Sequence, residues 1–130
     1  MSVRADTASA RIAGLIGLEA ISLAVMSSLH LAGVIAGGRK PFDPTNAGIA
    51  EAVICVALSA GAITLVRAPE RGRIAALAAL MFAVLGFIVG ITVTAQGGDA
   101  VDIAYHSTVL PLLLLTLALL VTARPSGRRL

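Results

Sequence analysis

The stretch IAALAALMFAVLGFIVGITV, Ile74 to Val93, contains no charged side chain and decides the fold class. A bilayer hydrocarbon core about 30 Å thick needs about 20 apolar residues in a helix. The stretch has that length, and it lacks the two-residue alternation of a membrane barrel strand. A helix bonds its own backbone polar groups, which is required in lipid. The stretch therefore predicts a transmembrane helix.

Three further segments of this kind lie in the chain, and together with 74–93 they predict helices at about 12–36, 47–66 and 103–123. Hydrophobic residues make up 58% of the 130 residues and charged residues 13%, whereas soluble domains carry about 25% charged residues. A chain of this length cannot bury so much apolar surface in a core of its own. We expect an all-α polytopic membrane protein, with a single domain over 1–130 that forms an up-down bundle of four transmembrane helices.

Charge in the connections predicts the orientation of this bundle. Eight of the ten basic residues lie in the two ends of the chain and in the second connection: Arg4, Arg11, Arg67, Arg71, Arg73, Arg124, Arg128 and Arg129. The other two connections carry Arg39 and Lys40 alone. Because cytoplasmic loops are enriched in Lys and Arg, we expect both termini to be cytoplasmic. Lys40 is the single lysine, and this preference for arginine suggests a GC-rich bacterial genome, so we expect a bacterial inner membrane. The first segment is too long for a cleaved signal peptide, so we expect it to be retained as a helix.

Ionisable residues on three of the predicted helices fall at a common level. At about 1.5 Å per residue, His30 and Glu51 lie roughly 10 Å below the outer ends of the first and second helices. Tyr105 and His106 lie one to two turns into the fourth helix, and Asp102 precedes His106 by four residues on the same face. Such groups cost about 2.5–3.5 kcal/mol each at a helix centre, and they turn inward. The sequence predicts a polar pocket in the outer half of the bundle.

Glu19 suggests that polar character extends inward from this pocket. It precedes His30 by eleven residues, or three helical turns, and so shares its face. If this face meets the second helix, the two helices form a polar seam, because polar residues there repeat every four positions: Glu51, Cys55 and Ser59. The alternative is that Glu19 pairs with Arg11 or Arg73 near the inner surface.

Several small or rigid residues predict local geometry. Gly86 and Gly90 have the small-xxx-small spacing that lets helices approach closely. Asp43 and Pro44 are typical of a helix start, with the aspartate as N-cap and the proline at the first helical position. Pro111 lies within the fourth segment and removes one helical hydrogen bond there.

Three kinds of ligand suit the predicted pocket. His30, Glu51 and His106 are suitable ligands for a divalent transition metal, although the chain has no closely spaced metal motif. Haem between the two histidines is disfavoured, because aromatic residues make up only 3% of the chain. Without a metal, the same side chains suit a proton or a small ligand, with Glu19, Asp102 and Tyr105 contributing. Hydrogen bonds that only fix the helix register are the remaining interpretation.

Two functional hypotheses remain open. The first is a small membrane protein that binds a proton, a metal ion or a small ligand in this pocket. The second is a structural accessory subunit of a larger membrane complex, or a homo-oligomer, with no chemistry of its own. Catalysis is disfavoured because no nucleophile elbow or phosphate-binding glycine loop is present. The arginines lie between apolar segments, so we expect lipid rather than nucleic acid as the partner.

Three stretches carry a family resemblance: HLAG at the end of the first helix, GIAEAVICVAL at the start of the second, and DIAYH at the start of the fourth. Together they resemble small four-helix bacterial membrane proteins of the DoxX-like kind. The resemblance implies the same four-helix architecture, and it places His30, Glu51, Tyr105 and His106 at the polar positions of interest. It implies no particular activity.

Overall fold

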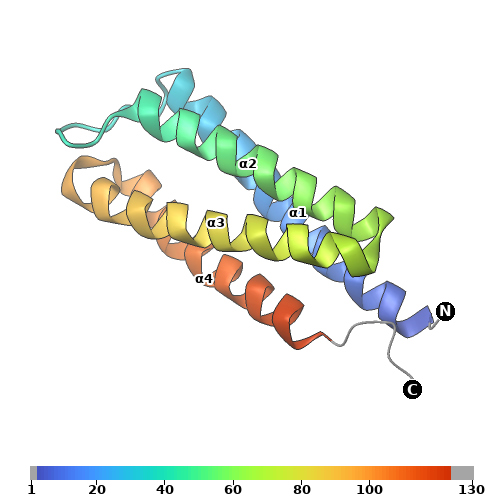
Figure 1. Cartoon of the computed structure of the whole chain (residues 1–130). Coiled ribbons are helices and arrows are strands. Elements are labelled where there is room, and N and C mark those ends of the chain that lie inside the picture. The colour runs from blue at the N-terminus through green and yellow to red at the C-terminus, as the bar shows by residue number, and fades with distance from the viewer. Residues whose placement is uncertain (1–2, 124–130) are drawn as a thin grey trace.

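The computed structural model describes residues 3–123, with side chains from residue 7 onward. Over these residues the chain is all-helical, which confirms the predicted fold class. The helices are α1 (Val3–Leu31), α2 (Pro44–Arg67), α3 (Pro69–Gly97) and α4 (Ala100–Thr122). Each is long and apolar enough to cross a membrane. Consecutive helices pack against each other and run in alternating directions, and α4 closes the bundle against α1 (Figure 1).

The two ends of the bundle differ in their connections. The first turn of α1, the junction of α2 with α3 and the last turn of α4 lie at one end (Figure 1). Residues 32–43 and 98–99 lie at the other, which we call the loop end. The basic residues predicted to be cytoplasmic fall at the end opposite the loop end, but Arg124, Arg128, Arg129 and the side chain of Arg4 lie outside the described residues. The orientation in a membrane stays a prediction.

The helix boundaries differ from the predicted ones in an instructive way. The third helix runs from Pro69 to Gly97, well beyond the apolar stretch 74–93, because hydropathy marks only the part of a helix suited to lipid. The first helix ends at Leu31 instead of near residue 36, since Gly33 adopts a positive φ of 72° that ends the helix. The predicted start of the second helix is confirmed. Its Asp43 carboxylate accepts a hydrogen bond from the Asn46 amide at 3.0 Å.

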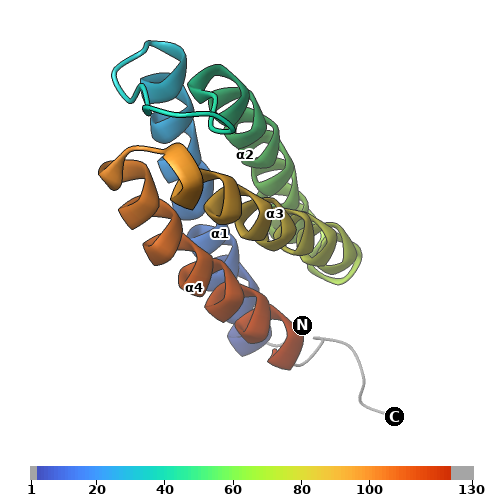
Figure 2. The ribbon, with the colours of Figure 1, turned by 90° about the vertical axis from the view of Figure 1, so that its left-hand side faces the viewer.

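The connection 32–43 folds back over the loop end (Figure 2). The backbone amides of Gly38 and Arg39 both donate to the carbonyl of Gly97, at 3.0 and 3.2 Å. Gly97 is required there, because a Cβ at this position would overlap the Arg39 carbonyl. Ile35 and Phe42 are buried. The connection is thus attached to the end of α3 and inserts two side chains into the bundle, although most of its residues are exposed.

The core follows the three- and four-residue spacing of helix faces. On α4 the buried positions are Asp102, His106, Val109, Leu113, Thr116 and Leu120. Apolar side chains from all four helices fill the centre, among them Ile16, Leu58, Leu80 and Leu113, each fully buried. The outward faces are also apolar, with large exposed side chains such as Leu18, Val56 and Leu85. An apolar exterior around a packed core is the arrangement expected for helices in lipid.

Small residues set the distances between neighbouring helices. A Cβ at Gly86 would lie 2.6 Å from the Ile54 side chain of α2, and one at Gly90 would lie 2.7 Å from the His106 ring of α4. Gly61 of α2 is similarly close to Ala79 of α3. The two glycines predicted from their spacing therefore lie at close contacts, each against a different helix.

Candidate functional site

The site is centred on His30, which lies in the last turn of α1. Its Nδ1 is 2.8 Å from Oε2 of Glu51, two turns into α2. Both residues are buried, with exposed fractions of 2% and 4%. A bond of this length between an imidazole and a carboxylate links the end of the first helix to the second.

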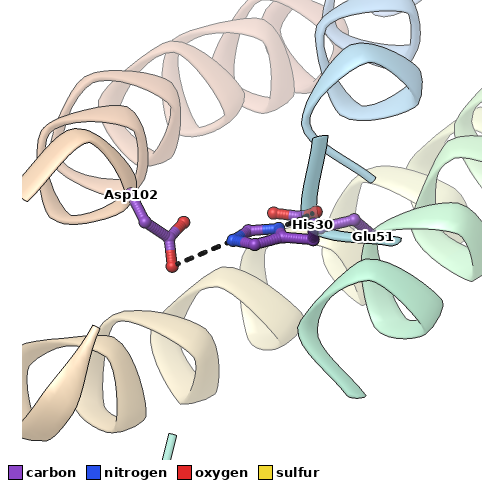
Figure 3. Close-up of side chains that lie close together, drawn as sticks. All are labelled: His30, Glu51 and Asp102. Atoms are coloured by element: carbon purple, nitrogen blue, oxygen red, sulfur yellow. Dashed lines mark hydrogen bonds and ion pairs between the residues drawn. The ribbon is translucent and has the colours of Figure 1, made fainter. Parts of the chain in front are cut away.

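Asp102 of α4 approaches the same histidine from the other side (Figure 3). Its Oδ2 lies 3.5 Å from His30 Nε2, and the residue is fully buried. One ligand atom each from His30, Glu51 and Asp102 can be chosen so that all three lie within 4.8 Å of one another. We call these three residues the buried cluster. Three helices do supply ionisable groups at one level, as the sequence predicted.

His106 joins the buried cluster through Asp102, one helical turn away. Its Nδ1 is 3.0 Å from the backbone carbonyl oxygen of Asp102 and 3.0 Å from the carboxylate Oδ1. A carbonyl oxygen only accepts hydrogen bonds, so Nδ1 carries a proton and donates it. The His106 ring packs against Phe87, with 4.9 Å between ring centroids. The expected ligand set was His30, Glu51 and His106. In the structure Asp102, and not His106, completes the group of potential ligand atoms with His30 and Glu51, and His106 contacts Asp102.

The buried cluster holds polar atoms that lack hydrogen-bond partners. Within residues 7–123, Glu51 Oε1, His30 Nε2 and Asp102 Oδ1 are buried and make no hydrogen bond. Leaving a buried polar group without a partner costs about 1–3 kcal/mol, and more when it is charged. Each of the three residues contributes one such atom, although Asp102 Oδ1 lies 3.0 Å from His106 Nδ1 and His30 Nε2 lies 3.5 Å from Asp102 Oδ2. The cluster is therefore only partly satisfied by the protein itself.

Thr94 and Phe42 also belong to this site, and the sequence reasoning missed both. The Thr94 hydroxyl of α3 donates to Asp102 Oδ2 at 3.3 Å. Phe42 lies beside His30, with 6.0 Å between ring centroids. Thr94 had a detectable signal, because it follows the buried Phe87 by seven residues on one helix face. Phe42 lies in a connection, where no periodicity indicates burial.

Glu19 of α1 and Tyr105 of α4 take part in contacts between α1 and α4, whereas the sequence predicted a polar seam between the first and second helices. Glu19 Oε1 accepts a hydrogen bond from Thr116 Oγ1 of α4 at 2.7 Å. The Tyr105 hydroxyl lies 3.0 Å from Ser22 Oγ of α1. The contacts of Glu19 and Tyr105 therefore join α1 to α4, whereas Ser27 of α1 donates to the Gly48 carbonyl of α2 at 2.7 Å. Cys55, expected in the seam, packs half-buried against the hydrophobic core.

The alternative expected for Glu19 was an ion pair with an arginine. Among the described residues neither Arg11 nor Arg73 pairs with it. Arg73 instead donates a hydrogen bond to the Val121 carbonyl at 3.0 Å, in the last turn of α4. Free carbonyls at a helix C-terminus attract cations, so this contact fixes the end of α4. Glu19 is left with Thr116 as its partner and with Oε2 unbonded.

Comparison of the chain with protein-family models, curated proteins and solved structures finds no match. The resemblance to DoxX-like proteins therefore stays a prediction. The chemistry of the site has to be argued from its own side chains, which are two carboxylates and two imidazoles buried among four apolar helices.

Proposed function

We propose that the chain is a multi-pass membrane protein whose buried cluster binds one divalent transition-metal ion through His30, Glu51 and Asp102. The observation that carries this proposal is the set of unbonded atoms. Each of the three residues has one buried atom without a hydrogen-bond partner, and their ligand atoms lie within 4.8 Å of one another. A cation bound by these residues gives His30 Nε2 and Glu51 Oε1 a partner and compensates the charge of the Asp102 carboxylate.

The state of His30 suits a metal ligand. With Glu51 ionised, the bond between Nδ1 and Glu51 is donated by the imidazole, which leaves a lone pair on Nε2. For Glu51 to bind the same ion as Nε2, its carboxylate releases this hydrogen bond and turns Oε1, which has no hydrogen-bond partner, toward the ion. Nε2 lies 3.5 Å from Asp102 Oδ2. Two atoms bound to one tetrahedral zinc ion lie about 3.3–3.6 Å apart.

The donor set and its charge favour a particular class of ion. Imidazole suits Zn²⁺, Fe²⁺ and related ions, whereas Mg²⁺ and Ca²⁺ prefer oxygen ligands alone. Two ionised carboxylates balance the charge of one divalent cation. This matters in an apolar bundle, because an uncompensated buried charge is strongly destabilising. The site therefore fits a first-row transition metal, and zinc is a convenient probe.

His106 and Thr94 act on the ion through Asp102. The imidazole N–H lies within 3.0 Å of Asp102 Oδ1, and the threonine hydroxyl donates to Oδ2. Partners of this kind orient a ligating carboxylate, and their loss typically weakens metal binding about 10–100-fold. We assign both as positioning residues, with no contact to the ion itself.

The test compares two aspartates of the same helix end. The purified chain is stripped with a chelator and titrated with Zn²⁺ against a chromogenic competitor. We expect one tight site per chain in the wild type and its loss in Asp102→Asn. The matched control is Asp99→Asn, because Asp99 is exposed and only caps α4 through the Val101 amide at 2.8 Å. That variant should bind zinc as the wild type does.

Two results would contradict the proposal. The first is a wild-type chain that binds no zinc, iron or manganese. The second is equal zinc affinity in the wild type and in Asp102→Asn. If the metal-free wild type also purifies in fixed ratio with a larger membrane complex, the accessory-subunit hypothesis replaces the proposal.

A further inference from the structure

A second feature of the loop end is a cavity of about 570 Å³ between α2 and α3. Small side chains on the two facing helices leave this space, among them Ala47, Ala50, Gly86 and Gly90. Pro41 and Phe42 cover its end. Small-molecule sites in proteins are typically clefts of about 300–1,000 Å³ with mostly apolar walls. The cavity has that size and that character.

Two polar side chains, Glu51 and His106, lie in the wall of this cavity. His106 Nδ1 carries the proton that faces the Asp102 carbonyl, so in the neutral ring Nε2 is an acceptor. No hydrogen bond to Nε2 is formed within residues 7–123. Glu51 Oε1 is likewise unbonded. His106 Nε2 is therefore an acceptor without a partner beside the cavity, whereas Glu51 Oε1 is enclosed by protein atoms.

Two of the other polar groups along the cavity are already engaged, whereas the side-chain amide of Asn46 forms no hydrogen bond within residues 7–123. The Thr94 hydroxyl donates to Asp102, and the Asp43 carboxylate accepts from the Asn46 amide. An occupant therefore meets a mostly apolar surface, with the His106 acceptor in its wall and the exposed Asp43 and Asn46 side chains at the start of α2. This pattern selects an apolar body with a hydrogen-bond donor at one end, and the Glu51 carboxylate repels an anionic head.

We propose that this cavity binds a lipid-soluble molecule with one neutral hydroxyl head, of the phenol or long-chain alcohol class, whose O–H donates to His106 Nε2. The apolar body lies along Gly86 and Ala50 between α2 and α3. The proposal does not depend on the metal ion, since His106 contacts the buried cluster through Nδ1 and the cavity through its other side.

A photoreactive probe pair tests the hydroxyl requirement. The probes are a para-alkylphenol with a diazirine in its chain and the methyl ether of the same molecule, which has no O–H. Each is incubated with the wild-type chain in lipid nanodiscs and irradiated, and the labelled peptides are mapped. We expect the phenol to label α2 and α3 around the cavity about tenfold more than the ether, the size of one hydrogen bond.

Three variants assign the labelling to the cavity. Ala50→Phe fills it and should abolish labelling by both probes. Ala60→Phe adds the same side chain to an exposed position of α2 outside the cavity and should leave labelling unchanged. His106→Phe keeps the ring volume but removes the acceptor, so phenol labelling should fall to the level of the ether.

The proposal is overturned by equal labelling with phenol and ether in the wild type, which indicates filling by any apolar chain. It is also overturned if Ala50→Phe is labelled like the wild type, or if a cationic alkylamine probe labels the cavity more than the phenol does. Zinc binding measured on Ala50→Phe should match the wild type. The failure of the cavity proposal is thereby separated from the failure of the metal proposal.

Discussion

Gly90 of α3 lies directly against the imidazole of His106 of α4, so that a Cβ at position 90 would come within 2.7 Å of Nε2. Real Cβ contacts are never this close, so any larger residue moves the ring. His106 in turn contacts Asp102 through Nδ1. The close packing of Gly90 against His106 therefore helps to fix the position of the Asp102 carboxylate on α4.

Gly90→Ala should displace the His106 ring and loosen Asp102. We expect zinc affinity to fall about 10–100-fold, the usual effect of losing a partner behind a metal ligand. The control is Gly17→Ala on α1, where a Cβ meets no atom within 4 Å. That change should leave zinc affinity unchanged and raise stability by up to about 1 kcal/mol. Unchanged zinc affinity in Gly90→Ala would show that His106 does not position the site.

Thr116→Val should destabilise the bundle without affecting metal binding. It removes the hydroxyl that donates to Glu19 Oε1 and leaves both buried oxygens of Glu19 without partners. The expected cost in the free energy of unfolding is about 1–3 kcal/mol. The matched control is Thr108→Val, because the exposed Thr108 bonds only to the Ala104 carbonyl of its own helix. An equally large loss of unfolding free energy in Thr108→Val would show that the contact between α1 and α4 does not explain the effect of Thr116→Val.

Zinc binding should weaken as pH falls. A metal ion needs the imidazole lone pair of His30 and the ionised carboxylates of Glu51 and Asp102, so protons compete with it. Each displaced proton lowers the apparent affinity by up to about tenfold per pH unit. Titration between pH 7.5 and 5.5 should show this loss together with proton release on binding at the lower pH. A pH-independent affinity would exclude these three residues as ligands.

Metal binding should also stabilise the fold, because the three ligands belong to three different helices. Free Zn²⁺ at 100 times its dissociation constant adds about 2.7 kcal/mol to the free energy of unfolding. Thermal unfolding in detergent with and without zinc should show a rise in Tm for the wild type. Asp102→Asn should show no rise, and an equal rise in both would indicate binding elsewhere.

The depth of the site in the bundle was predictable from the sequence, whereas the contacts between its side chains were not. Counting residues from helix ends brought His30 and Glu51 together, and the i, i+4 spacing placed Asp102 and His106 on one face. Periodicity identifies the residues that share a face, but it does not say which neighbouring helix that face meets. This is why Glu19 was expected to face α2 or an arginine, yet bonds to Thr116 of α4.

Thr116 itself could have been found from the sequence. It continues the alternating three- and four-residue spacing that starts at Asp102 and His106 on the buried face of α4. The position of Asp102 beside His30 was not accessible in the same way. Asp102 and His106 lie on one helix face, and only the structure shows that the Asp102 carboxylate faces His30 while the His106 ring packs closely against Gly90.

The most direct test of the metal proposal is the zinc X-ray absorption spectrum of the chain loaded with one equivalent of Zn²⁺. We expect nitrogen and oxygen ligands at about 2.0–2.2 Å, including the scattering pattern of one imidazole. That imidazole signal should disappear in His30→Gln and remain in His106→Gln. A sulfur ligand at about 2.3 Å, or an imidazole signal that survives in His30→Gln, would contradict the account.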